Sequence, residues 1–83
     1  MKLLYFAWLK QKIGTDAEEI TLPDDVNDVA GVIAWLKTRG DKYATALKDD
    51  AVVRVAVNQT YAKPDTPVSD GDEVALFPPV TGG

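Results

Sequence analysis

The chain has 83 residues, of which 46% are hydrophobic and 27% are charged. This size and composition indicate one globular domain, because a second domain would be too small to bury a core of its own. The formal net charge is −4, and the lysines and arginines are scattered, so the sequence argues against nucleic-acid binding. No apolar run approaches the roughly 20 residues that span a bilayer. We expect a cytoplasmic protein with no membrane partner.

The sequence contains no cysteine and no histidine. Disulfides, thiolate nucleophiles, zinc sites built on sulfur or imidazole, and a histidine base are therefore excluded. Carboxylates, hydroxyls, a few lysines and the chain ends remain available for chemistry. We expect no metal site and no bound cofactor, and the composition does not favour an autonomous enzyme.

The first part of the chain predicts a hairpin. Residues 2–9 are rich in aromatic and branched side chains and predict a strand. Both faces of this strand are apolar: one carries Leu3, Tyr5, Ala7 and Leu9, and the other carries Leu4, Phe6 and Trp8. Residues 14–16 supply a turn, and residues 18–22 alternate as a second strand with Ile20 and Leu22 inward.

Helical spacing appears in the middle of the chain. Asp28 is the expected N-cap, with Asn27 as the alternative, of a helix that runs to about Thr38 and stops before Gly40. Its apolar residues recur at helical intervals: Val29, Val32, Ile33 and Leu36. Residues 41–48 predict one more helical turn, with Tyr43 and Leu47 as its apolar contacts.

The last third predicts three further strands. Residues 52–57 form the first, with Val53, Val55 and Val57 on one face. A turn at 58–60 leads to a brief edge strand at 61–62, and residues 73–77 form the last strand with Val74 and Leu76 inward. The order is typical of the ubiquitin-like β-grasp class of α+β folds. We expect a mixed sheet of about five strands with one main helix on one face, although the pattern leaves other α+β sandwiches open.

We assign residues 1–77 to the domain and residues 78–83 to an extended tail. The tail consists of Pro78, Pro79, Val80, Thr81, Gly82 and Gly83. Two prolines cannot continue a strand ladder, and two glycines make the end thin enough for a narrow channel. Fully extended, the tail reaches roughly 20 Å. It is suited to presenting its α-carboxylate to another protein; a frayed end is the alternative.

Residues 55–83 contain the motifs VNQT, DGDEVA and FPPVTGG. In this order and spacing, the motifs closely resemble those of the small subunit of molybdopterin synthase. The front half fits the same family more loosely, through FA in the first strand and GTDA at the turn.

The resemblance implies a sulfur carrier that works in a heterotetrameric sulfurtransferase. In that family an adenylyltransferase similar to ubiquitin-activating enzymes uses ATP to adenylate the terminal glycine, here Gly83. A sulfur donor protein then converts the adenylate to a thiocarboxylate. The large subunit draws the tail, here residues 78–83, into its own active site. Two carriers in succession supply the dithiolene sulfurs to cyclic pyranopterin monophosphate. The catalytic residues and the ATP site belong to the partners.

A partner surface is expected on the exposed sheet face. The residues that we assign to it are Phe6, Tyr61, Phe77, Leu4 and Lys10, with Arg54 and Lys63 as further rim cations. An apolar patch with a charged rim is typical of a recognition site, although single exposed aromatic residues are also common. Trp8 and Trp35 are assigned to packing, and Asn58 to shaping its turn.

Three other functions remain open from the sequence. The chain could be a sulfur carrier for thiazole synthesis, cysteine synthesis or tRNA thiolation. It could be a ubiquitin-like modifier that is joined to lysines of other proteins through Gly83. It could also be an interaction domain with an inert tail, which would tolerate removal of Gly82 and Gly83.

Overall fold

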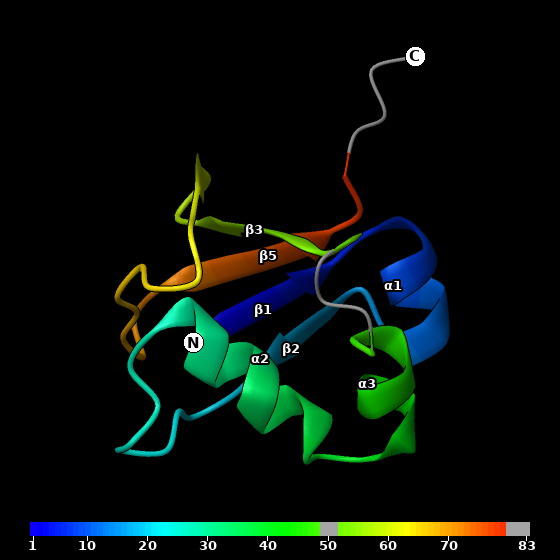
Figure 1. Cartoon of the computed structure of the whole chain (residues 1–83), viewed down its shortest axis with the longest axis horizontal. Coiled ribbons are helices and arrows are strands. Elements are labelled where there is room, and N and C mark those ends of the chain that lie inside the picture. The colour runs from blue at the N-terminus through cyan, green and yellow to red at the C-terminus, as the bar shows by residue number, and fades with distance from the viewer. Residues whose placement is uncertain (49–51, 80–83) are drawn as a thin grey trace.

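A computed structural model describes residues 1–48 and 52–79 of the chain. This part forms one five-stranded sheet and three helices (Figure 1). The strands are β1 (Lys2–Tyr5), β2 (Ala17–Glu19), β3 (Arg54–Val57), β4 (Thr60–Tyr61) and β5 (Glu73–Phe77). The helices are α1 (Ala7–Ile13), α2 (Val29–Lys37) and α3 (Asp41–Ala46). None of the helices in this part is long and apolar enough to cross a membrane.

The sheet is mixed, with the strand order β2-β1-β5-β3-β4. The last strand, β5, lies in the centre, where it pairs parallel with β1 and antiparallel with β3. The two outer pairs, β1 with β2 and β3 with β4, are antiparallel. This arrangement confirms the expected α+β β-grasp fold.

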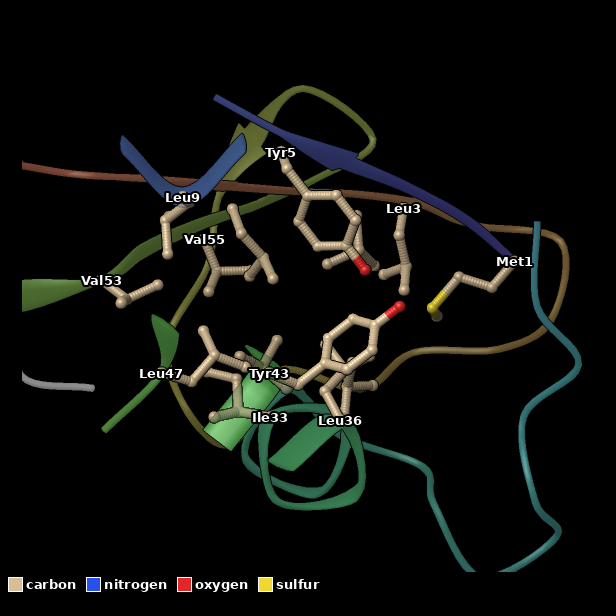
Figure 2. Close-up of a cluster of buried hydrophobic side chains, with 14 of the residues drawn as sticks. Met1, Leu3, Tyr5, Leu9, Ile33, Leu36, Tyr43, Leu47, Val53 and Val55 are labelled. Carbon is tan, nitrogen blue, oxygen red and sulfur yellow. The ribbon is translucent and has the colours of Figure 1, made fainter. Parts of the chain in front are cut away.

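One face of the sheet and all three helices share a single core. The inward residues alternate along the strands as predicted, and those of β5, Val74 and Leu76, are buried. Figure 2 shows Leu3 and Tyr5 of β1 facing Leu36 of α2 and Tyr43 of α3 across this core. Trp8 and Trp35 are partly buried and pack against the core, as expected. Within the described residues, all three helices bury their apolar residues in this one core, and none covers the opposite face of the sheet.

The predicted strand over residues 2–9 is wrong beyond Tyr5. Phe6 has an extended backbone and is the N-cap of α1, which begins at Ala7. Helix α1 places Leu9 and Ile13, four residues apart, against the core, where they are 0% and 1% exposed. The run of aromatic and branched residues favoured a strand locally, but burial of this helical stripe decides the outcome.

The predicted hairpin is also corrected. β1 and β2 do pair antiparallel, but the whole of α1 connects them instead of a tight turn. Gly14 ends α1 with a left-handed φ of 92° and donates its N–H to the carbonyl of Lys10. β2 is shorter than predicted, so Ile20 and Leu22 lie after it, although Leu22 is buried.

The helices and turns of the remaining chain follow the prediction. Asp28 caps α2 by accepting a hydrogen bond of 2.7 Å from the N–H of Gly31. α3 begins where predicted, ends two residues earlier than expected and buries Tyr43, and Leu47 just after it is 0% exposed. β3 begins two residues later and β4 one residue earlier than expected. Asn58 and Gln59 form the two-residue turn between them with φ values of 51° and 70°.

Candidate partner surface and tail

The exposed face of the sheet carries a row of apolar residues across all five strands. Strand register places Leu4 of β1 opposite Ala75 of β5, and Ala75 opposite Ala56 of β3. The row continues to Ala17 of β2 at one end and to Tyr61 of β4 at the other. Large side chains therefore stand near the two sides, and only methyl groups lie on the two central strands. We call this row the alanine strip; it is shallow and open to a partner.

Phe77 lies next to this strip, at the end of β5. Its strand alternates between half-buried and buried residues, and Phe77 is on the half-buried, outward side. The ring of Tyr61 lies 5.8 Å from the ring of Phe77, centroid to centroid, at an interplanar angle of 46°. Tyr61 is 77% exposed. The prediction that these two aromatic residues come together on the outer face is confirmed.

The other predicted partner residues meet at a hollow beside the end of β1. The hollow has a volume of about 310 Å³ and is lined by Leu4, Tyr5, Phe6, Ala7, Lys10, Asp16 and Ala17. Phe6 is 48% exposed there, and its N–H donates to the carbonyl of Leu76 at 3.1 Å. Because Leu4 belongs to both the hollow and the alanine strip, the two features form one continuous surface.

The three cations that were predicted to form the rim lie at different places around the surface. Arg54 lies opposite Phe77 in the ladder between β3 and β5, so it stands beside the aromatic pair. Lys63 is exposed just after β4. Lys10, the third predicted rim cation, lines the hollow together with the carboxylate-bearing Asp16.

The tail is described only at its start. Pro78 and Pro79 follow β5 directly and are half-buried. Val80, Thr81, Gly82 and Gly83 lie outside the described residues, so what the sequence predicts for them stays a prediction.

Small residues of the surface were missed by the sequence reasoning. The sequence gives no signal of binding for three alanines on strands, Ala17, Ala56 and Ala75, because a short side chain on a strand is compatible with any surface. It gives none for Asp16 either, which lies in the turn before β2. Only the strand register reveals that three of them line up across the sheet.

Two of the motifs that carry the family resemblance contact each other. The side-chain amide of Asn58 donates to Asp72 at 3.0 Å, and its oxygen accepts from the N–H of Glu73 at 3.0 Å. The hydrogen bond from Asn58, followed by the one from Ser69, lowers the pKa of Asp72. The VNQT turn and the DGDEVA turn thus fix the start of β5, which confirms the structural role assigned to Asn58.

A second hollow, of about 520 Å³, lies on the helical side of the sheet between α2 and β3. Its walls include Ala30 and Ala34 of α2, Val55 of β3 and Val53 just before β3. The short side chains of the two alanines leave this space between helix and sheet. Its lining includes Arg54, one of the predicted rim cations, but none of the predicted apolar partner residues.

A polar cluster lies on the buried side of the sheet, behind the hollow at the end of β1. The hydroxyls of Tyr5 and Tyr43 both donate to Oε2 of Glu18 at 2.7 Å. Nη1 of Arg39 lies 3.4 Å from Oε1 of the same carboxylate. The Arg39 guanidinium also stacks on the rings of Trp35 and Tyr43, at 5.2 and 5.0 Å from the centroids. We call this group, centred on Glu18, the Glu18 clasp.

The clasp shifts the pKa values of its members. Burial, reinforced by the hydrogen bond to Glu18, raises the pKa of both Tyr5 and Tyr43. Burial alone would raise the pKa of Glu18 as well. The hydrogen bonds from the two tyrosines and the charge of Arg39 outweigh that effect, so the pKa of Glu18 is lowered. The cluster is therefore held together by an ionised carboxylate.

A mixed sheet with a central parallel pair, a helical layer on one face and an open apolar strip on the other defines a ubiquitin-like β-grasp protein. Comparison with known proteins agrees with this class. The ThiS family matches residues 3–83, and the chain belongs to this family.

Individual relatives cover the whole chain. The molybdopterin synthase sulfur carrier subunit of Escherichia coli K12 is 43% identical over 83 residues, which is 100% of this chain and 99% of that protein. Small archaeal modifier protein 1 of Haloferax volcanii superimposes with a TM-score of 0.74 at 27% identity, covering 96% of this chain and 97% of that one. A chain from the complex of subunits 1 and 2 of the molybdopterin-converting factor of Helicobacter pylori superimposes with a TM-score of 0.63 at 26% identity. The match covers 99% of this chain and 96% of that one.

Proposed function

We propose that this chain is the sulfur carrier subunit of a molybdopterin synthase and that Gly83 carries the sulfur as a thiocarboxylate. The observation that carries the proposal is the full-length match to the Escherichia coli sulfur carrier subunit. It is supported by the FPPVTGG motif that directly continues β5 and by the absence of cysteine from the sequence. Without cysteine, a sulfur atom has to be held by another group, and a terminal carboxylate can hold it.

The proposed chemistry begins with activation of the Gly83 carboxylate. A carboxylate is a poor electrophile because its oxygen is a poor leaving group. ATP converts it to an acyl adenylate and releases pyrophosphate, which supplies AMP as a good leaving group. Sulfide, supplied by the sulfur donor protein, then attacks the carbonyl carbon and AMP departs with the electrons of the broken C–O bond. Loss of the remaining proton leaves a thiocarboxylate, which is a soft nucleophile that is ionised at neutral pH.

The exposed sheet face is the proposed docking surface for the large subunit. The complex of subunits 1 and 2 from Helicobacter pylori shows that a relative pairs with a second subunit. In this chain the alanine strip offers a flat apolar centre, and Phe77 with Tyr61 offers an aromatic anchor next to the tail. Aromatic residues in an apolar centre with a polar rim are typical of an interface.

The same surface is proposed to meet an adenylyltransferase similar to ubiquitin-activating enzymes. Gly83 has to reach the adenylyltransferase first and the large subunit later, so the two partners use the domain in turn. This order also requires a sulfur donor protein between the two encounters. We place all three partners in the cytoplasm. The active sites and the ATP belong to the partners, and this chain supplies the reacting carboxylate and the surface that delivers it.

Intact mass tests the proposal. The chain is incubated with ATP, the adenylyltransferase and a sulfide source, and a reaction without ATP is the control. We expect the mass to rise by the difference between one sulfur and one oxygen atom, and the change to map to the C-terminal peptide. An unchanged mass, or a sulfur adduct elsewhere on the chain, would contradict the proposal.

A ubiquitin-like modifier is the second candidate, because small archaeal modifier protein 1 shares the fold at 27% identity. Both functions begin with the same adenylate at Gly83 and differ in the nucleophile that follows, which is a lysine amine in the modifier. Peptide mapping of total protein from cells that express the chain separates them. Gly-Gly remnants on lysines of other proteins would favour the modifier, and a free thiocarboxylate would favour the carrier.

A further inference from the structure

The chain reverses abruptly where β1 becomes α1. Tyr5 ends the strand, Phe6 is extended, and Ala7 begins the helix with a φ of 56°. This left-handed conformation is unfavourable for a residue with a β-carbon. Such a conformation persists only where the surrounding structure holds it. The same turn forms one wall of the hollow that exposes Phe6.

Three hydrogen bonds hold this turn from different directions. The N–H of Tyr5 donates to the carbonyl of Asp16 at 3.0 Å, and the N–H of Phe6 donates to the carbonyl of Leu76 at 3.1 Å. These two bonds fix the backbone between β2 and β5. The third is the bond of 2.7 Å from the Tyr5 hydroxyl to Glu18 on the buried face. It fixes the side chain of the last residue before the reversal.

The clasp and the hollow lie on opposite faces of the same two strands. Neighbouring residues of a strand point to opposite faces, so Glu18 turns inward to the clasp while Ala17 lines the hollow. In the same way, Leu4 and Phe6 stand on either side of the buried Tyr5 in the sequence. A displacement of Tyr5 or Glu18 inside the protein would therefore move the walls of the hollow outside it.

We infer that Tyr5 is a positioning residue for the partner surface: its hydrogen bond to Glu18 holds the end of β1 so that Phe6 is presented beside Leu4 and Lys10. The inference rests on the proposed function for the role of that surface. Tyr5 is 1% exposed, so its hydroxyl cannot touch a partner. Its effect on binding is therefore indirect, through the position of Phe6.

Tyr43 provides a matched control. It donates the same kind of hydrogen bond to the same Oε2 of Glu18 at the same 2.7 Å, but it comes from α3 and does not line the hollow. Tyr5→Phe and Tyr43→Phe each remove one hydroxyl and keep the ring. If the clasp only stabilises the domain, the two variants should behave alike. If Tyr5 positions Phe6, they should differ in binding.

The first measurement is titration calorimetry of each folded variant with the purified large subunit. We expect Tyr5→Phe to weaken binding by about threefold to tenfold, the factor that corresponds to one net hydrogen bond. Tyr43→Phe should change binding by less than about twofold, with a similar loss of melting temperature. Equal effects of the two variants on binding, or no effect of Tyr5→Phe, would overturn the inference.

The second measurement is hydrogen exchange of the Phe6 amide in the free chain, which needs no partner. Tyr5→Phe should accelerate exchange of this amide more than Tyr43→Phe does. The reason is that residue 5, next to the hydrogen bond from Phe6 to Leu76, is then no longer held by Glu18. Identical exchange in the two variants would overturn the inference. If the wild-type chain does not bind the large subunit at all, the proposed function fails, and the exchange result still decides whether Tyr5 positions Phe6.

Discussion

The two faces of the sheet differ most sharply at two neighbouring residues of β5. Leu76 faces the helices and is 0% exposed, whereas Phe77 faces away from them and is half-buried beside Tyr61. Both are large and apolar, so hydrophobicity alone does not distinguish their roles. Their positions in a strand, where side chains alternate, do. The difference teaches that one face of this sheet packs the core that stabilises the domain, whereas the other face is available to a partner.

The two faces are also built from different side chains. On the buried face, branched and aromatic residues from the strands pack against the helices. The ionised carboxylate of Glu18 accepts hydrogen bonds from two tyrosines and pairs with Arg39. On the exposed face, alanines occupy the centre of the strip. Large side chains that fill space stabilise the fold, and small ones leave a flat surface that another protein can cover.

Leu76→Ala should have the largest effect on stability. The residue is fully buried in the centre of the core, and truncation of such a leucine removes its packing and leaves a cavity. We expect a loss of about 2–5 kcal/mol in the free energy of unfolding, measured by chemical denaturation. A loss below about 1 kcal/mol would mean that the core does not depend on the inner face of β5.

Phe77→Ala should separate the two faces. We expect binding to the large subunit to weaken by about 1–3 kcal/mol, which is typical of an aromatic anchor, as measured by calorimetry. The domain should stay folded, because the ring lies outside the core. A large fall in melting temperature with unchanged affinity would assign Phe77 to the fold and remove it from the partner surface.

Acid should lower the free energy of unfolding through the Glu18 clasp on the buried face. The pKa of Glu18 is lower in the folded chain than its ordinary value, because the hydrogen bonds from Tyr5 and Tyr43 and the charge of Arg39 outweigh burial. A lowered carboxyl pKa contributes stability above the unfolded-state pKa of about 4.3, and this contribution is lost as the pH falls through the folded-state value. This is a smaller effect than either substitution above.

Unfolding curves of the wild type and Glu18→Gln, measured from neutral pH into acid, check this prediction. Glutamine keeps an oxygen for the tyrosine hydroxyls but carries no charge. The wild type should be the more stable protein at neutral pH, and the difference should shrink in acid. A difference that stays constant with pH would show that the charge of Glu18 contributes nothing.

The sequence predicts an element well where its local pattern fits only one kind of secondary structure. Asp28 is a strong cap before a helical stripe, and β5 alternates cleanly between Val74 and Leu76, so both elements lie where they were expected. The start of the chain is different, because residues 2–9 are apolar on both faces of a strand and also place Leu9 on a helical stripe. Only packing against the rest of the core selects the helix from Ala7 onwards.

The site was predictable to the same degree. Phe77 and Tyr61 could be assigned from the sequence because both were placed at outward strand positions, and the structure brings their rings together. The Glu18 clasp was not foreseen, because its hydrogen bonds join residues that lie 13 and 25 positions apart. Sequence spacing gives no signal for contacts of that separation when they join different elements of the fold.

The central claim is that Gly83 delivers sulfur, and single-turnover transfer from a chemically prepared thiocarboxylate tests it most directly. The loaded chain is mixed with the large subunit and cyclic pyranopterin monophosphate, without the adenylyltransferase. Gly82→Val is the matched variant, because its added carbons would displace the reacting carbon in a narrow channel, and displacements near 1 Å can reduce rates by about a hundredfold.

We predict that the wild-type chain returns to a carboxylate as the dithiolene forms, and that the valine variant transfers far more slowly while binding normally. A thiocarboxylate that stays intact in the presence of both the large subunit and the precursor would contradict the account.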